Sequence, residues 1–245
     1  YTDLFNPEAV REFIEVSYKP YLTRYKNYSP ERPAGIFTDE PHIHARYFDR
    51  RTPSLGTLSW SPSVAEKFKE LHDYDLTDSL PLLFEEKNGW RKVRHDYYTT
   101  VALQFEESFT KQIADFCAQT GSIFTGHYLG EDALGKVRDR IGNAMLHYRN
   151  MQQPGMDHLG LTINGRIITA KSLSSVANQY DRPVRTSEIF GICGQDLGFE
   201  DRRWLAGWHV ALGVNHFVQH LSAYSLKGAR KRDYPPTLSY HQPYW

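Results

Sequence analysis

Two stretches, Gly35-Ile-Phe-Thr-Asp-Glu-Pro41 and Val184-Arg-Thr-Ser-Glu-Ile-Phe-Gly191, each carry an apolar run directly into a carboxylate. A β-branched or aromatic run bounded by turn residues is typical of a buried strand. In a parallel α/β sheet the carboxyl ends of the strands hold ligands and catalytic groups. Glu40 and Glu188 are therefore candidates for the facing carboxylates that glycosidic bond hydrolysis requires. The alternative is structural: each acid pairs with an arginine or caps a helix.

Strand-like runs recur at a regular spacing in the second half of the chain. They start near residues 122, 155, 184 and 214, about 30 residues apart, which is the length of a βαβ unit. Strands that alternate with helices predict a parallel sheet with right-handed crossovers. Helices are expected at 6–19, 63–71, 77–84, 91–119, 132–150, 168–179 and 199–212.

With the run at 35–38, the chain provides five expected strands, whereas a closed barrel needs eight. We predict an α/β fold, a parallel (β/α)8 TIM-type barrel of which this chain is a fragment carrying strands four to eight. Residues 1–245 would then be the C-terminal part of a catalytic barrel, with a long loop insertion at about 42–90 after strand four. An open doubly wound sheet is the alternative. No Gly-x-Gly-x-x-Gly loop follows a strand to support dinucleotide binding.

Composition excludes several classes of partner. Lys and Arg number 29, as do Asp and Glu, so no basic excess is available to track nucleic acid phosphates. No apolar stretch approaches the roughly 18 residues of a membrane span. The two cysteines are too few for a disulfide framework and lack metal-type spacing. The 16 tyrosines, 13 phenylalanines and 5 tryptophans suit either a core or sugar-stacking platforms.

Each expected strand ends in polar or ionisable residues. On one rim, these groups would form a polar cleft suited to hydroxyl-rich ligands, because buried polar groups are costly without partners. In chain order they are Asp39 and Glu40; His127, with Glu131 four residues on; Asp157 and His158; Ser187 and Glu188; and Gln219, His220, Ser222 and Tyr224.

Several of these segments resemble a known group of enzymes. Thr38-Asp39-Glu40-Pro41 is similar to the Asn-Glu-Pro that carries the general acid/base at strand four of retaining barrel glycoside hydrolases, and Ser187-Glu188 resembles their strand-seven nucleophile. Phe124-Thr-Gly-His-Tyr-Leu-Gly-Glu131 fits as well. The most specific match is the tail, Leu221-Ser-Ala-Tyr-Ser225, Arg230-Lys-Arg-Asp-Tyr-Pro-Pro236 and Ser239-Tyr-His-Gln-Pro-Tyr-Trp245. Together they resemble large, mostly uncharacterised bacterial glycoside hydrolases grouped near family 106 α-L-rhamnosidases.

The resemblance implies roles for particular residues. Glu40 is expected to be the general acid/base, and Glu188 the nucleophile, or the base of an inverting mechanism. Asp39 stands where the group has asparagine, and its charge beside Glu40 favours the protonated form that a general acid needs. Residues expected to contact substrate are Asp39, His127, Asp157, His158, His220, Tyr224, His241 and Trp60. Calcium is a further candidate, with Asp39, Asp157 and Glu131 as its possible ligands.

Two other functions stay open from the sequence. One is a non-catalytic carbohydrate-binding barrel, in which the acids hold sugar hydroxyls without cleavage. The other is a metal-dependent barrel hydrolase with His127, Asp157, His158 and His220 as ligands. The expected partners are an oligosaccharide or glycoside substrate and the remainder of the same polypeptide, with the missing barrel strands and accessory β-domains; nucleic acid and membranes are not expected.

Overall fold

The computed structural model describes residues 2–28, 35–43, 57–228 and 234–239. The chain begins with a helical run of three parts, α1 (Pro7–Phe13), the π-helical turn η1 (Ile14–Tyr18) and α2 (Lys19–Tyr28). Asn6 caps it by accepting from the Glu8 and Ala9 backbone N–H groups at 2.9 and 3.3 Å. We expected this helix to end before Pro20, which was wrong. The π-helical turn η1 ends two residues before Pro20. Its wider hydrogen-bonding pattern allows the helix to continue through a residue that has no backbone N–H.

The five expected strands are present, and every pair is parallel. β1 (Gly35–Thr38) pairs with β2 (Ile123–Gly126) in one sheet. β3 (Gly155–His158), β4 (Thr186–Ile189) and β5 (His216–Gln219) form a second sheet in the order β3-β4-β5.

The prediction of an eight-stranded TIM-type barrel is wrong. The residues that the structure describes form one two-stranded and one three-stranded sheet. The strand ladder is interrupted between β2 and β3, because Phe124 bonds to the turn before β3 instead of to the strand itself. Its N–H donates to the Gln152 side chain at 3.0 Å, and its carbonyl accepts from the Gln153 N–H at 3.1 Å. The 30-residue spacing correctly indicated parallel βαβ units, but spacing carries no information about closure.

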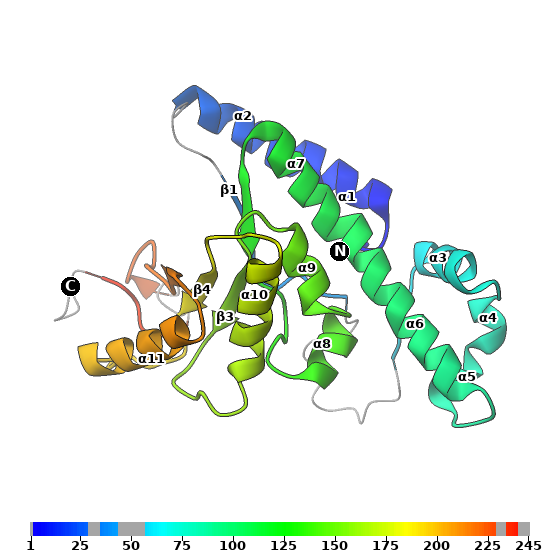
Figure 1. Ribbon diagram of the computed structural model, residues 1–245. Helices are drawn as coiled ribbons and strands as arrows, with labels where there is room; N and C mark the ends of the chain where they lie inside the picture. The colour runs from blue at the N-terminus through cyan, green and yellow to red at the C-terminus, as the bar shows by residue number, and fades with distance from the viewer. Residues whose placement is uncertain (1, 29–34, 44–56, 229–233, 240–245) are drawn as a thin grey trace.

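A long helical run leads into β2. It comprises α6 (Trp90–Phe105), the π-helical η2 (Glu106–Lys111) and α7 (Gln112–Thr120). Three shorter helices, α3 (Pro62–His72), α4 (Leu76–Ser79) and α5 (Pro81–Phe84), gather at the far end of α6, away from the strands (Figure 1). The segment expected as a loop insertion at about 42–90 is thus helical over much of its described part. Whether it is an insertion stays a prediction.

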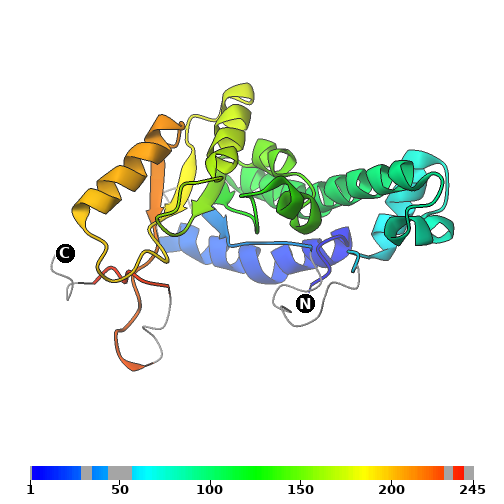
Figure 2. The ribbon, with the colours of Figure 1, turned by 90° about the horizontal axis from the view of Figure 1, so that it is seen from below.

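The remaining helices connect the later strands. They are α8 (Leu134–Arg140), α9 (Ala144–Asn150), α10 (Ile167–Gln179) and α11 (Phe199–Ala211). The single helix expected at 132–150 is broken at Gly142, which adopts a φ of 76°, and Asn143 caps the new helix. Figure 2 shows the N-terminal helices (blue) on one side of the strands and the later connecting helices on the other. No helix in the described ranges is long and apolar enough to cross a membrane.

Two glycines let the strand ends approach one another closely. A Cβ on Gly126 would lie 2.2 Å from the Thr38 carbonyl oxygen of β1, and one on Gly155 would lie 2.3 Å from the Gly126 carbonyl oxygen. Gly126 also has a φ of 124°, which side-chain-bearing residues rarely adopt. Beneath this point the core buries Phe124 and Met156. The fold therefore brings the carboxyl ends of β1 and β2 together, next to the start of β3.

Candidate active site

The polar residues at the carboxyl ends of β1, β2, β3 and β4 lie close together. Asp157 of β3 and Glu188 of β4 are register partners, so their Cα atoms lie side by side. His127 follows β2, and its backbone N–H donates to the Thr38 carbonyl oxygen of β1 at 3.0 Å. Asp39 and Glu40 follow β1 directly. The two sheets thus contribute to one cluster of ionisable groups.

The contact between His127 and Glu188 is central to this cluster. The Nε2–H of His127 donates to Oε2 of Glu188 at 2.6 Å, and the two side chains are only 2% and 14% exposed. Burial alone would lower the pKa of His127. The hydrogen bond to Glu188, with the negative charges of Asp157, Glu131 and Glu188, outweighs burial and raises that pKa to about 9. At neutral pH His127 is therefore an imidazolium.

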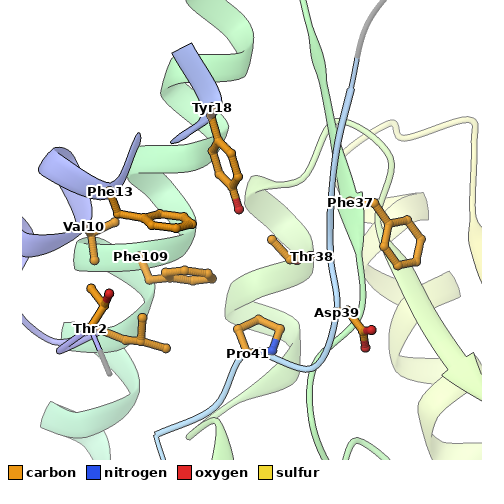
Figure 3. A pocket seen from close by; sticks show the side chains of 10 residues that line it. Thr2, Val10, Phe13, Tyr18, Phe37, Thr38, Asp39, Pro41 and Phe109 are labelled. Carbon is orange, nitrogen blue, oxygen red and sulfur yellow. The ribbon is translucent and has the colours of Figure 1, made fainter. Parts of the chain in front are cut away.

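The aromatic ring of Phe37 and the carboxylate of Asp39 also lie near His127. The Phe37 ring meets the imidazole edge-to-face with centroids 5.4 Å apart. Asp39 Oδ1 lies 3.8 Å from His127 Nε2, although the Asp39 side chain is 80% exposed. Figure 3 shows the side chains of Phe37 and Asp39 on the opposite side of β1 from Phe13, Tyr18 and Phe109. The strand's alternation thus turns both residues toward the cluster.

Asp157 joins the two proposed catalytic acids electrostatically. Burial and the nearby charges of Glu40 and Glu188 together raise its pKa to about 6, against the opposing effects of His127 and Arg166. Glu40 and Glu188 therefore both act on the same carboxyl group. Three carboxylates and one imidazolium share this end of the sheets.

Glu131 is a buried member of the cluster, which the sequence predicted as a polar group of the cleft and as a possible cation ligand. It is 4% exposed, and its Oε1 accepts from the Tyr128 N–H at 2.9 Å. Burial, with the charge of Asp157, raises its pKa to about 8. The sequence indicated this residue only through its position four residues after His127. Its burial could not be predicted from the sequence.

Glu40 has a strained backbone. Its φ of 50° lies in the left-handed region, which glutamate rarely occupies, and His42 Nδ1 lies 3.0 Å from its carbonyl oxygen. Non-glycine residues held in such conformations concentrate at functional sites. The side chain borders a cavity of about 240 Å³ that Glu131 and Asp157 also line.

The other residues predicted to contact substrate have varied surroundings. His158 is buried, lines the same cavity and packs edge-to-face against Trp208 and His209 of α11. His220 is 7% exposed at the end of β5 and lies close to Gly191. Tyr224 is 96% exposed, and Trp60, which precedes α3, is 45% exposed. His241 lies outside the described residues, as does most of the tail motif.

A second cavity, of about 210 Å³, lies on the opposite face of β1 (Figure 3). Phe13 and Tyr18 of the N-terminal helices, Phe109 of η2 and Pro41 face it. Its lining is mostly apolar, and Asp39 of the ionisable cluster also borders it. Among the residues that the structure describes, no three His, Cys, Asp or Glu side chains are arranged to hold a metal ion.

Comparison with known proteins gives a structural relative. The chain matches a rhamnosidase from Novosphingobium sp. PP1Y with a TM-score of 0.65 and 22% sequence identity. The match covers 89% of this chain and 20% of that enzyme, so the chain spans about a fifth of the length of its relative. No protein-family model and no curated protein matches the sequence. The fold is therefore similar to one part of a glycoside hydrolase.

Proposed function

We propose that this chain carries the catalytic carboxylates of a glycoside hydrolase, with Glu40 as general acid/base and Glu188 as nucleophile. The observation that carries the proposal is the arrangement around Asp157, whose pKa responds to the charges of both Glu40 and Glu188. Glycosidic bond cleavage needs two carboxyl groups close to one point. The fold's similarity to part of a rhamnosidase supports the same reaction class.

The surroundings of Glu188 suit a carboxylate that must stay ionised. The imidazolium of His127 donates to its Oε2 at 2.6 Å, which stabilises the anion and fixes its orientation. The backbone of β4 holds Glu188 beside β3 and β5, so little rearrangement is available to it. Such a group can attack an anomeric carbon or accept a proton from water.

Glu40 suits the complementary role. It borders the cavity and directly follows Asp39 in the chain. In the proposed reaction Glu40 gives its proton to the departing glycosidic oxygen while Glu188 bonds to the anomeric carbon. Glu40 then takes a proton from water as that water displaces Glu188, which restores both groups. In an inverting reaction Glu188 instead deprotonates the attacking water, and NMR of the first-formed anomer separates the two.

The test compares Glu40→Gln and Glu188→Gln with wild type on a panel of aryl glycosides. General acid–base and nucleophilic roles predict rate losses on the order of 10²-fold or more. Glu107→Gln is the matched control, because Glu107 lies in η2 and pairs with Lys67 at 3.2 Å. Wild-type rates in both site variants would refute the assignment. Sugar binding without hydrolysis by wild type would favour a carbohydrate-binding module.

A further inference from the structure

A buried threonine in the π-helical stretch η2 contacts two side chains from other segments. Thr110 is fully buried, and its hydroxyl oxygen lies 2.7 Å from the Tyr128 hydroxyl and 2.7 Å from His147 Nδ1. Elsewhere in the same helical run, the hydroxyl of Thr100 donates to the Asp96 carbonyl oxygen four residues before it, which is a common local bond of a helical threonine. Widened turns such as η2 are frequent at functional sites.

The hydrogen bonds around Thr110 run in one direction. The Nε2–H of His147 donates to the Ile141 carbonyl oxygen at 2.9 Å. Burial lowers the pKa of His147 to about 4, so the ring is neutral and its Nδ1 is an acceptor. Thr110 therefore donates to His147 Nδ1, and its oxygen accepts from the Tyr128 hydroxyl. Each of the three side chains has its polar atoms satisfied.

Tyr128 is held by its ring and its backbone as well as by its hydroxyl. The ring stacks on His147 with centroids 4.3 Å apart and planes at 21°, and Phe105 meets it edge-to-face. The backbone N–H of Tyr128 donates to Glu131 Oε1 at 2.9 Å. With the hydroxyl bound to Thr110, both ends of this buried residue are fixed.

The position of Tyr128 bears directly on the candidate active site, because Tyr128 follows His127 in the chain. On its other side His127 is tied to β1, where its backbone N–H donates to the Thr38 carbonyl oxygen at 3.0 Å. From this backbone the imidazole Nε2–H reaches Glu188 Oε2 at 2.6 Å. A short charge-assisted hydrogen bond of this kind depends steeply on geometry, so a shift of the backbone would weaken it.

We propose that Thr110 is a positioning residue, which acts through Tyr128 to hold His127 in hydrogen-bonding contact with Glu188. Its effect on catalysis rests on the proposed function, because Glu188 is the nucleophile of that reaction. The contact between His127 and Glu188 can, however, be measured without a substrate. The role of Thr110 and the hydrolase function are therefore tested by separate readouts.

The test compares Thr110→Val with wild type in the natural full-length polypeptide. NMR of protein with isotope-labelled histidine measures how fast the Nε2 proton of His127 exchanges with solvent. We expect exchange at least about tenfold faster in Thr110→Val, because two buried groups lose their hydrogen bond to the hydroxyl. Thr110→Ser restores the hydroxyl and should exchange like wild type. On a hydrolysed glycoside, Thr110→Val should lower kcat and leave KM nearly unchanged.

Thr100→Val is the matched control. Thr100 is equally buried in the same helical run, and its hydroxyl also contacts a histidine, with its oxygen 3.1 Å from His72 Nε2. This variant should lose stability but leave the His127 proton and kcat unchanged. Tyr128→Phe removes only the second hydroxyl of the pair and should reproduce Thr110→Val, so it serves if the valine variant does not fold.

Several results would overturn the proposal. They are wild-type exchange in Thr110→Val or in Tyr128→Phe, no protected Nε2 proton on His127 in wild type, no rescue by serine, or the same acceleration in Thr100→Val. A wild type that shows the expected exchange pattern but hydrolyses no glycoside would instead refute the hydrolase function and leave the positioning role of Thr110 standing.

Discussion

Replacing Glu188 with glutamine should lower the pKa of His127 strongly. The rise from 6.5 to about 9 corresponds to roughly 3.4 kcal/mol at 1.36 kcal/mol per pH unit. The 2.6 Å hydrogen bond that His127 donates to Glu188 is the largest of the influences that raise this pKa, and burial opposes them all. Glutamine keeps the volume and an acceptor but removes the charge. We therefore expect the pKa of His127 to fall by at least about one unit in Glu188→Gln.

The measurement is a pH titration of the imidazole carbon-bound protons by two-dimensional NMR. Wild type should show one histidine that stays protonated to about pH 9, and Glu188→Gln should move that resonance alone. The sign also applies to stability. A raised histidine pKa contributes stability fully below pH 6.5, and the contribution disappears as the pH rises through 9. The reasoning fails if no histidine titrates above pH 8 in wild type, or if the variant leaves that titration unchanged.

Three further predictions concern stability, measured by urea denaturation. Asp96 is buried between Lys92 and Tyr74, and its pKa is lowered to about 2. Asp96→Asn should therefore lower the free energy of unfolding by about 2 kcal/mol at pH 7, and the difference from wild type should fade between pH 4 and 2. A loss below about 0.5 kcal/mol at pH 7 would contradict this. Because the pKa of Glu131 is raised, wild type should lose stability as the pH rises from 4.5 to 8. Glu131→Gln should reduce this pH-dependent loss in the free energy of unfolding by roughly 2–4 kcal/mol. Parallel plots of stability against pH for the two proteins would refute the prediction. Gly126→Ala should lower the free energy of unfolding by about 3 kcal/mol or more, because its Cβ would meet the backbone of β1. A Cβ at Gly135 meets no atom within 4 Å, so Gly135→Ala should be neutral or stabilising. Equal effects of the two substitutions would contradict the close approach of the strands.

The local elements were readable from the sequence because their signals are local. The apolar run at 35–38 became β1 with the expected bounds, and the helix expected at 91–119 extends from Trp90 to Thr120. Its π-helical stretch, η2, was not foreseen, since a widened turn leaves the spacing of apolar residues nearly unchanged. Side-chain periodicity therefore fixed element type and position, but not the fine geometry of the helix.

Closure and the site's contacts were not readable, because they depend on residues far apart in the chain. The break between β2 and β3 depends on the Gln152 side chain bonding to Phe124, which no strand pattern encodes. His127 and Glu188 are 61 residues apart, and their hydrogen bond follows only from the packing of two sheets.

The leaving-group dependence of the Glu40→Gln variant tests the central claim most directly. The dinitrophenolate leaving group of a dinitrophenyl glycoside departs without protonation, whereas the methoxide of a methyl glycoside of the same sugar needs a proton from a general acid. The account predicts that Glu40→Gln loses on the order of 10²-fold or more on the methyl glycoside and far less on the dinitrophenyl glycoside, while Glu188→Gln loses heavily on both. Equal losses of Glu40→Gln on the two substrates, or wild-type rates on the methyl glycoside, would contradict it.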